Sequence, residues 1–193
     1  MSTPRINPLA RIASTAVLEG DVRVGAHARI LHGAILCAHD GVIEVGTHTI
    51  VMEQVVLRAS ARFPLTIGDH CLVGPHVSVS GAEIGSEVFL ATGAAVFPAA
   101  VVGRRSEVRI NGVVQLRTVL AEGTTVPIGW IAVGNPAQLF SPERHDELWA
   151  VQRELDFPGF VFGVDREDPD VMVRLTERYA DALLTDPRST RRE

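Results

Sequence analysis

The chain has 193 residues, enough for one medium domain with an appendage and without disulfide support. All 18 basic residues are arginine, which excludes Schiff-base and Walker-type chemistry because both need a lysine. The net charge of -5 argues against nucleic acid or an anionic membrane as a partner. The chain shows neither a signal-like start nor a long apolar run, so we expect a cytoplasmic protein in which Cys37 and Cys71 are free thiols.

The composition is 46% hydrophobic but only 5% aromatic, so a core must be built from small aliphatic side chains. Such residues recur every six positions, which fits neither a helix nor a simple alternating strand. Short strands joined by corners fit this period, with three strands to a coil and coils stacked about 4.8 Å apart. Short insertions separate three runs, and a shortened step leads to the fourth. The runs are Val24, Ile30 and Leu36; Val45, Val51 and Leu57; Ile67, Val73 and Val79; and Ile84, Leu90, Val96, Val102, Val108, Val114 and Leu120.

Glycine follows the inward aliphatic residue at several of these positions, as in Val24-Gly25 and Val45-Gly46, and suits a crowded or left-handed corner. The series closes with Thr125-Val126-Pro127-Ile128-Gly129 and Gly134-Asn135-Pro136-Ala137. This pattern resembles the hexapeptide-repeat superfamily. The resemblance implies an all-β solenoid, a left-handed parallel β-helix, over residues 1–137, with its coils starting near residue 17.

Residues 138–193 are expected to form a helical extension that packs on the solenoid or on a neighbouring subunit. Ser141-Pro142-Glu143 predicts a helix to about Leu155, and Asp168-Pro169-Asp170 predicts a second to about Leu184. Between them lies a loop that carries Phe157, Phe160 and Phe162, three rings for which we expect burial in a core. The final segment, TDPRSTRRE, is expected to fray.

The segment from Ala34 to Gly46 has the length and hydrophobic frame of the γ-class carbonic anhydrase branch. That resemblance implies a homotrimer, built through the solenoid faces, with zinc held by three histidines between subunits. The three ligand positions fall here on Arg58, Pro75 and Ser80, none of which offers an imidazole. We therefore predict no metal and no other cofactor, although a one-residue slip would leave His76, with His39 nearby, as an alternative ligand.

Without zinc, the cleft between subunits would be relined for binding or for another reaction on a small molecule. Arg58 in this cleft suits the binding of a carboxylate or phosphate, or else an ion pair with Glu53 of a neighbouring subunit. The predicted cleft consists of Met52, Glu53, Arg58, Pro75, His76 and Ser80.

His39 and Cys37 are the candidate catalytic residues. His39 stands beside Asp40 on an expected inserted loop, where it could act as a general base, and Cys37 could act as a nucleophile if its thiol is activated. An acyl-CoA or acyl-thioester acyltransferase is thus the alternative function, with acyl-CoA as its ligand. A solvated histidine and a buried thiol are the structural alternatives.

Three further histidines, His27, His48 and His70, recur at one position of successive coils. Stacking would place them in a column that could bind a transition metal. A left-handed turn position that tolerates histidine explains the same pattern, and the next coils carry Glu87 and Arg105 there. We favour the turn.

Overall fold

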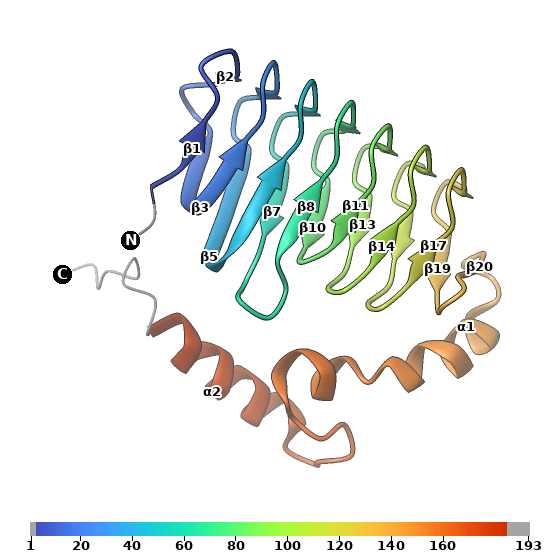
Figure 1. Ribbon diagram of the computed structural model, residues 1–193. Helices are drawn as coiled ribbons and strands as arrows, with labels where there is room; N and C mark the ends of the chain where they lie inside the picture. The colour runs from blue at the N-terminus through green and yellow to red at the C-terminus, as the bar shows by residue number, and fades with distance from the viewer. Residues whose placement is uncertain (1–2, 185–193) are drawn as a thin grey trace.

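The computed structural model describes residues 3–184, which form a β-solenoid followed by a helical segment (Figure 1). Each coil is a triangle of short parallel strands, and each strand directs one aliphatic side chain of the six-residue series inward. All of the predicted inward residues from Val24 to Leu120 are buried, with Ile30, Leu36 and Val51 at 0% exposure. The predicted left-handed parallel β-helix with a C-terminal helical tail is confirmed.

The strands line three faces of the prism, which are numbered here in the order in which the chain visits them. The first face holds β1 (Arg5–Ile6), β8 (Leu65–Ile67), β11 (Glu83–Ile84), β14 (Val101–Val102) and β17 (Val119–Leu120). The second holds β2 (Arg11–Ile12), β4 (Arg29–Ile30), β6 (Ile50–Val51), β9 (Leu72–Val73), β12 (Phe89–Leu90), β15 (Glu107–Val108) and β18 (Thr125–Val126). The third holds β7 (Val56–Arg58), β10 (Ser78–Ser80), β13 (Ala95–Val96), β16 (Val113–Val114) and β19 (Ile131–Val133).

Two long strands, β3 (Val17–Val24) and β5 (Ile35–Val45), run around the corner from the third face to the first. They pair with each other along nearly their whole length, and a register shift between Glu19 and Asp21 marks the bend. The third and first faces are therefore joined into one sheet at this end of the solenoid, on the side where the candidate catalytic residues lie.

The two ends of the solenoid differ from the sequence expectation. The first coil begins at Arg5, ahead of residue 17, because Ile6 already pairs with Val24 in parallel. Ile6 is 45% exposed because no coil precedes it. This first coil therefore lacks the fully enclosed inward aliphatic residues by which the later coils are recognised. At the other end, β20 (Gln138–Phe140) turns back and pairs antiparallel with β19, which ends the parallel stack.

The repeated glycines and the repeated histidines occupy different positions of the corners, and each has its own physical reason. A Cβ placed on Gly46 would lie 2.5 Å from the backbone carbon of Gly68 in the next coil, so this corner position requires glycine through crowding. Its φ is not positive, whereas His48, two residues later, has a φ of 56°. The left-handed turn is thus made two residues after the tight contact.

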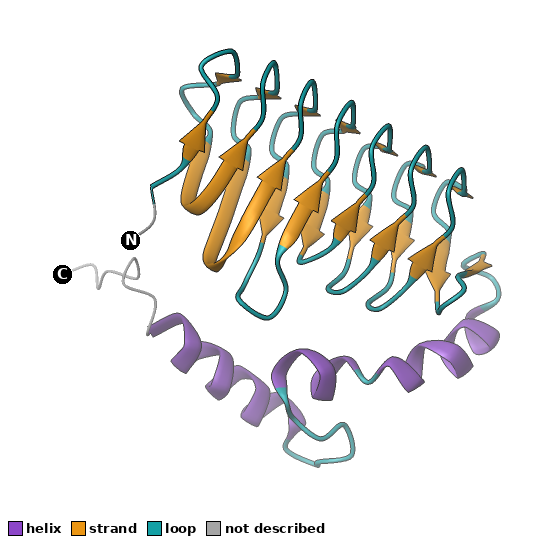
Figure 2. Cartoon of the chain, viewed as in Figure 1, coloured by secondary structure: helices purple, strands orange, loops and turns teal. Residues whose placement is uncertain are grey.

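The tail comprises α1 (His145–Gln152), the short helical turns η1 (Arg153–Leu155) and η2 (Pro158–Phe162), and α2 (Val171–Leu184). Figure 2 shows this helical segment following one side of the solenoid. The first helix begins at His145, slightly later than predicted, after a turn in which the Arg144 N–H donates to the Ser141 carbonyl. Leu148 and Leu155 are buried in a small second core beside Leu116, Val133 and Phe140.

The three phenylalanines of the predicted loop are not fully buried. Phe157 is 36% exposed, and Phe160 and Phe162 are half-buried. Phe160 lies 5.4 Å from the ring of Phe63, and Phe157 lies 6.2 Å from that of Phe97, so two of the rings attach the tail to the solenoid. The expectation of simple core burial was wrong, because a tail lying on a narrow prism covers each ring on one side.

The predicted frayed segment, residues 185–193, lies outside the described residues. Within the described range, no helix has the length and apolar character needed to cross a membrane.

Candidate functional site

A row of polar side chains follows the corner where the third face ends. Strand pairing aligns Glu19 with Cys37 and Cys37 with Arg58, and the next coil adds Ser80 opposite Arg58. The preceding residue of each strand points inward, so the row itself points outward. We call Glu19, Cys37, Arg58 and Ser80 the corner row.

The Cys37 side chain makes two contacts, one with Glu19 of the corner row and one with His39 outside it. Its thiol donates to Oε2 of Glu19 at 3.3 Å, and its Sγ lies 3.6 Å from Nε2 of His39. Side chains two apart on a straight strand point the same way but stand roughly 7 Å apart. His39 comes closer because its φ of 44° bends the chain at this point. The thiol therefore has two possible proton acceptors within reach.

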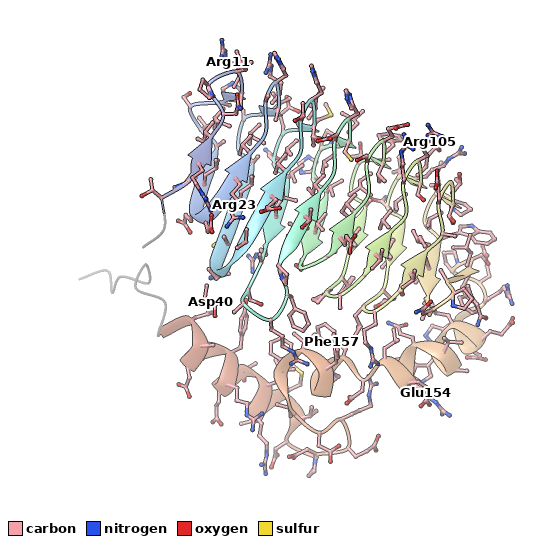
Figure 3. All side chains as sticks on the ribbon, in the orientation of Figure 1. Arg11, Arg23, Asp40, Arg105, Glu154 and Phe157 are labelled. Atoms are coloured by element: carbon pink, nitrogen blue, oxygen red, sulfur yellow. The ribbon has the colours of Figure 1, made fainter. Side chains whose placement is uncertain are left out.

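His39 and Asp40 lie within β5, and the sequence expectation of an inserted loop here was wrong. The strand continues because residues 42–45 pair with β3, and residues 43–45 also pair with β8, after the bend. Asp40 Oδ1 accepts a hydrogen bond from the Ala61 N–H at 3.0 Å, which ties the segment after β7 to this corner. In Figure 3, Asp40 lies on the side of the solenoid that faces the helical tail.

The other predicted cleft residues lie at a different corner. Met52 and Glu53 follow β6, and Pro75 and His76 follow β9, so all four stand before the third-face strands whose far ends carry Arg58 and Ser80. The two turns stack, with the His76 N–H donating to the Glu53 carbonyl at 3.1 Å. One chain therefore brings Cys37, His39, Arg58 and Ser80 to one corner and leaves the other four apart.

The charges around the corner row are distributed unevenly. Arg58 is exposed and forms no ion pair with any residue of the described range 3–184. On the adjoining first face, in contrast, Asp21 binds Arg5 and Arg23 at 3.0 and 2.8 Å. The hydrogen bond from Arg23 and then that from Arg5 lower the pKa of Asp21 to about 2. Arg58 is thus the cation of this corner that remains available to an anion.

Sequence reasoning missed Glu19 as a member of the site. The signal was present, since Glu19 precedes Cys37 by 18 residues, the length of one regular coil. Stacking at that separation makes two residues neighbours, so the repeat applied backward from Cys37 would have found it.

The three histidines predicted to stack do so. The rings of His27 and His48 lie 4.6 Å apart and those of His48 and His70 lie 5.1 Å apart, both nearly parallel. All three have φ between 56° and 59°, and Glu87 and Arg105 share this conformation in the next coils. Among residues 3–184, no group of three or more His, Cys, Asp or Glu side chains is arranged to hold a metal ion. The column is a repeated left-handed turn.

Comparison with known proteins finds relatives in sequence and in structure. No protein-family model matches the chain. An uncharacterized protein of Dictyostelium discoideum is 28% identical over 76% of this chain, and γ carbonic anhydrase 1 of Arabidopsis thaliana mitochondria is 24% identical over 75%. The chain spans 59% and 53% of the lengths of these relatives. A crystal structure of a candidate acetyltransferase from Bacillus cereus is 19% identical, covers 92% of both chains and superposes with a TM-score of 0.53.

The γ carbonic anhydrase relatives and the β-solenoid together support the hexapeptide-repeat superfamily. The resemblance to γ carbonic anhydrases implies a zinc ion, with its ligands expected at three positions of this sequence. At these positions Arg58 offers an exposed cation, Pro75 offers no side-chain donor, and Ser80 offers only a hydroxyl. Zinc sites are built from thiolate, imidazole and carboxylate groups, so these three positions do not fit the metal.

Proposed function

We propose that this hexapeptide-repeat protein is a γ-carbonic-anhydrase-like subunit without a zinc centre or CO2 hydration. In this proposal it assembles as a homotrimer, and the cleft between subunits binds or converts a small anionic molecule. The observation that carries the proposal is Arg58, an exposed guanidinium without an ion pair in residues 3–184, beside Cys37 and Ser80 in the corner row. A guanidinium offers paired donors to a carboxylate or a phosphate.

The arrangement within one chain supports the trimer. Met52, Glu53, Pro75 and His76 stand at one corner of the third face and Arg58 and Ser80 at the other, so a single chain does not close the predicted cleft. A rotational arrangement of identical copies sets one corner of a subunit against a different corner of its neighbour. Such an interface would bring the two groups together.

Three measurements on the purified full chain test this function. We expect less than stoichiometric zinc by elemental analysis, no CO2 hydration above the buffer rate with zinc added, and a trimer mass by light scattering. One zinc per subunit together with CO2 hydration would overturn the loss of the metal centre. A monomer at micromolar concentration would overturn the shared cleft.

Direct acyl transfer from acyl-CoA is the second candidate, favoured by the position of His39 at an exposed bend. Here His39 would take the proton of an acceptor amine or hydroxyl while the acyl group passes straight from donor to acceptor. Acetyl-CoA consumption that requires an added amine and persists in Cys37→Ser supports this candidate. Consumption that stops in Cys37→Ser contradicts it.

A further inference from the structure

We infer that Cys37 is a nucleophilic thiol that accepts the acyl group of an anionic acyl thioester, with His39 as its proton acceptor. The proposed function leaves the reaction of the cleft open. This inference deepens it by naming the reacting atom and the substrate class, and it rests on a cleft that zinc does not fill.

Geometry distinguishes Cys37 from the other cysteine of the chain. Cys37 is partly exposed, and its Sγ lies 3.6 Å from Nε2 of His39, within the range of a hydrogen bond to sulfur. Cys71 is 3% exposed and its thiol donates to the carbonyl of Gly85 at 3.1 Å. Burial raises the pKa of the Cys71 thiol. The chain therefore holds one thiol with an exposed base beside it and one that is enclosed.

The neighbours of Cys37 in the corner row give the substrate class. Glu19 stands on one side and accepts the thiol hydrogen bond at 3.3 Å, while Arg58 stands on the other. Glu19 accepts the thiol hydrogen on one side of Cys37, and the Arg58 guanidinium on the other side forms no ion pair in residues 3–184. An incoming molecule with a carboxylate or phosphate would place that group at Arg58 and its reactive carbon near the sulfur.

The reaction needs no component beyond the donor. The Cys37 S–H bond turns from Glu19 to His39. Its proton then moves to His39 Nε2, and the sulfur attacks the carbonyl carbon of the thioester. When the tetrahedral adduct collapses, the carbon–sulfur bond of the donor breaks and its thiolate takes the proton from His39. The products are an S-acyl Cys37 and a free donor thiol, so one thioester bond replaces another.

S-succinyl-N-acetylcysteamine is the first probe, because its carboxylate lies within a few carbon atoms of its thioester, as neighbouring strands require. S-acetyl-N-acetylcysteamine, which carries no charge, is the second. After brief incubation of the full chain, mass spectrometry of its peptides measures acylation at each cysteine. We expect Cys37 to be acylated and Cys71 to stay unmodified. Equal modification of the two thiols, or none at Cys37, would overturn the inference.

His39→Asn tests the role of His39 as proton acceptor. Asparagine tolerates the left-handed φ of 44°, but its side-chain amide is not a base. We expect acylation of Cys37 to slow about 100-fold, because no other base takes its place. His27→Asn is the matched control, since it makes the same replacement at φ 59° on a distant corner. An unchanged rate in His39→Asn, or an equal loss in His27→Asn, contradicts the role of His39.

Arg58→Gln tests the anionic class. We expect it to slow acylation by S-succinyl-N-acetylcysteamine while leaving the rate with S-acetyl-N-acetylcysteamine unchanged. A variant that reacts with the succinyl probe as fast as the parent does would overturn the role of Arg58. Zinc content and mass are measured on the same samples, so an unreactive Cys37 in a zinc-free trimer refutes this inference alone.

Discussion

Asp21 shows how two arginines stabilise one carboxylate at the scale of single residues. Hydrogen bonds from Arg23 and Arg5 lower the pKa of Asp21 from 3.8 to about 2. The unfolded chain therefore takes up a proton at this carboxyl before the folded chain does. The carboxylate stabilises the fold above about pH 4, and this contribution is lost as the pH falls toward 2.

Asp21→Asn should consequently lower the free energy of unfolding at pH 7. The difference between parent and variant should shrink between pH 4 and pH 2, because protonation then removes in the parent what the substitution removes in the variant. Urea unfolding at pH 7, 4 and 3 measures the difference. A gap that stays constant over this range would show that the ion pairs with Arg5 and Arg23 do not provide the stabilisation.

Residues also differ in how far the sequence determines their contacts. The column of His27, His48 and His70 could be predicted because it depends only on the regular spacing of the coils. The same spacing places Glu19 beside Cys37, one coil of 18 residues earlier. The contact of Cys37 with His39 could not be predicted, because it depends on a bend at His39 that interrupts the repeat. The proposed base of the candidate site lies where the periodicity fails.

At the scale of elements, the tail is held on the solenoid by a few aromatic and cationic contacts. The Arg117 guanidinium lies 4.7 Å from the Phe160 ring centroid and donates to the Leu155 carbonyl at 2.9 Å. Arg62 lies 5.1 Å from the same ring, which also packs on Phe63. The helices could be predicted from their capping patterns, but these contacts could not, since no repeat relates the tail to the coils.

Phe160→Ala should release the tail without unfolding the solenoid. Loss of one ring pair and two cation–π contacts should reduce the local opening free energy of η1 and η2 by about 2 kcal/mol. Hydrogen exchange of residues 145–165 measures this change, and the strands from β6 to β17 should keep their protection. Val173→Ala is the control, since Val173 is 54% exposed on α2. Equal protection in Phe160→Ala and the parent would contradict the contact.

At the scale of the whole molecule, the second face presents an apolar row to solvent. Ile50, Leu72 and Phe89 occupy three successive rungs and are 37–38% exposed. Arg29 precedes them on β4 and Glu107 follows on β15, so the row is bounded by charges of opposite sign. A surface of this kind suits contact with another copy of the chain.

Leu72→Glu should therefore dissociate the proposed trimer, because assembly would bury an unpaired carboxylate. Light scattering should give the monomer mass, while circular dichroism stays that of the parent. Thr125→Glu adds the same charge on β18 of the same face, outside the apolar row, and should remain trimeric. A trimer of Leu72→Glu would place the subunit contact on another face.

The antiparallel strand β20 has a consequence for the length of the molecule. The repeat itself does not determine how many coils are stacked. The last strands of such a stack offer unpaired backbone amides with which a further chain could pair. By folding back on β19, β20 occupies part of that rung, and α1 follows beside it. The ending is thus encoded outside the repeat, and it removes part of the edge on which the architecture alone would permit a fibre to grow.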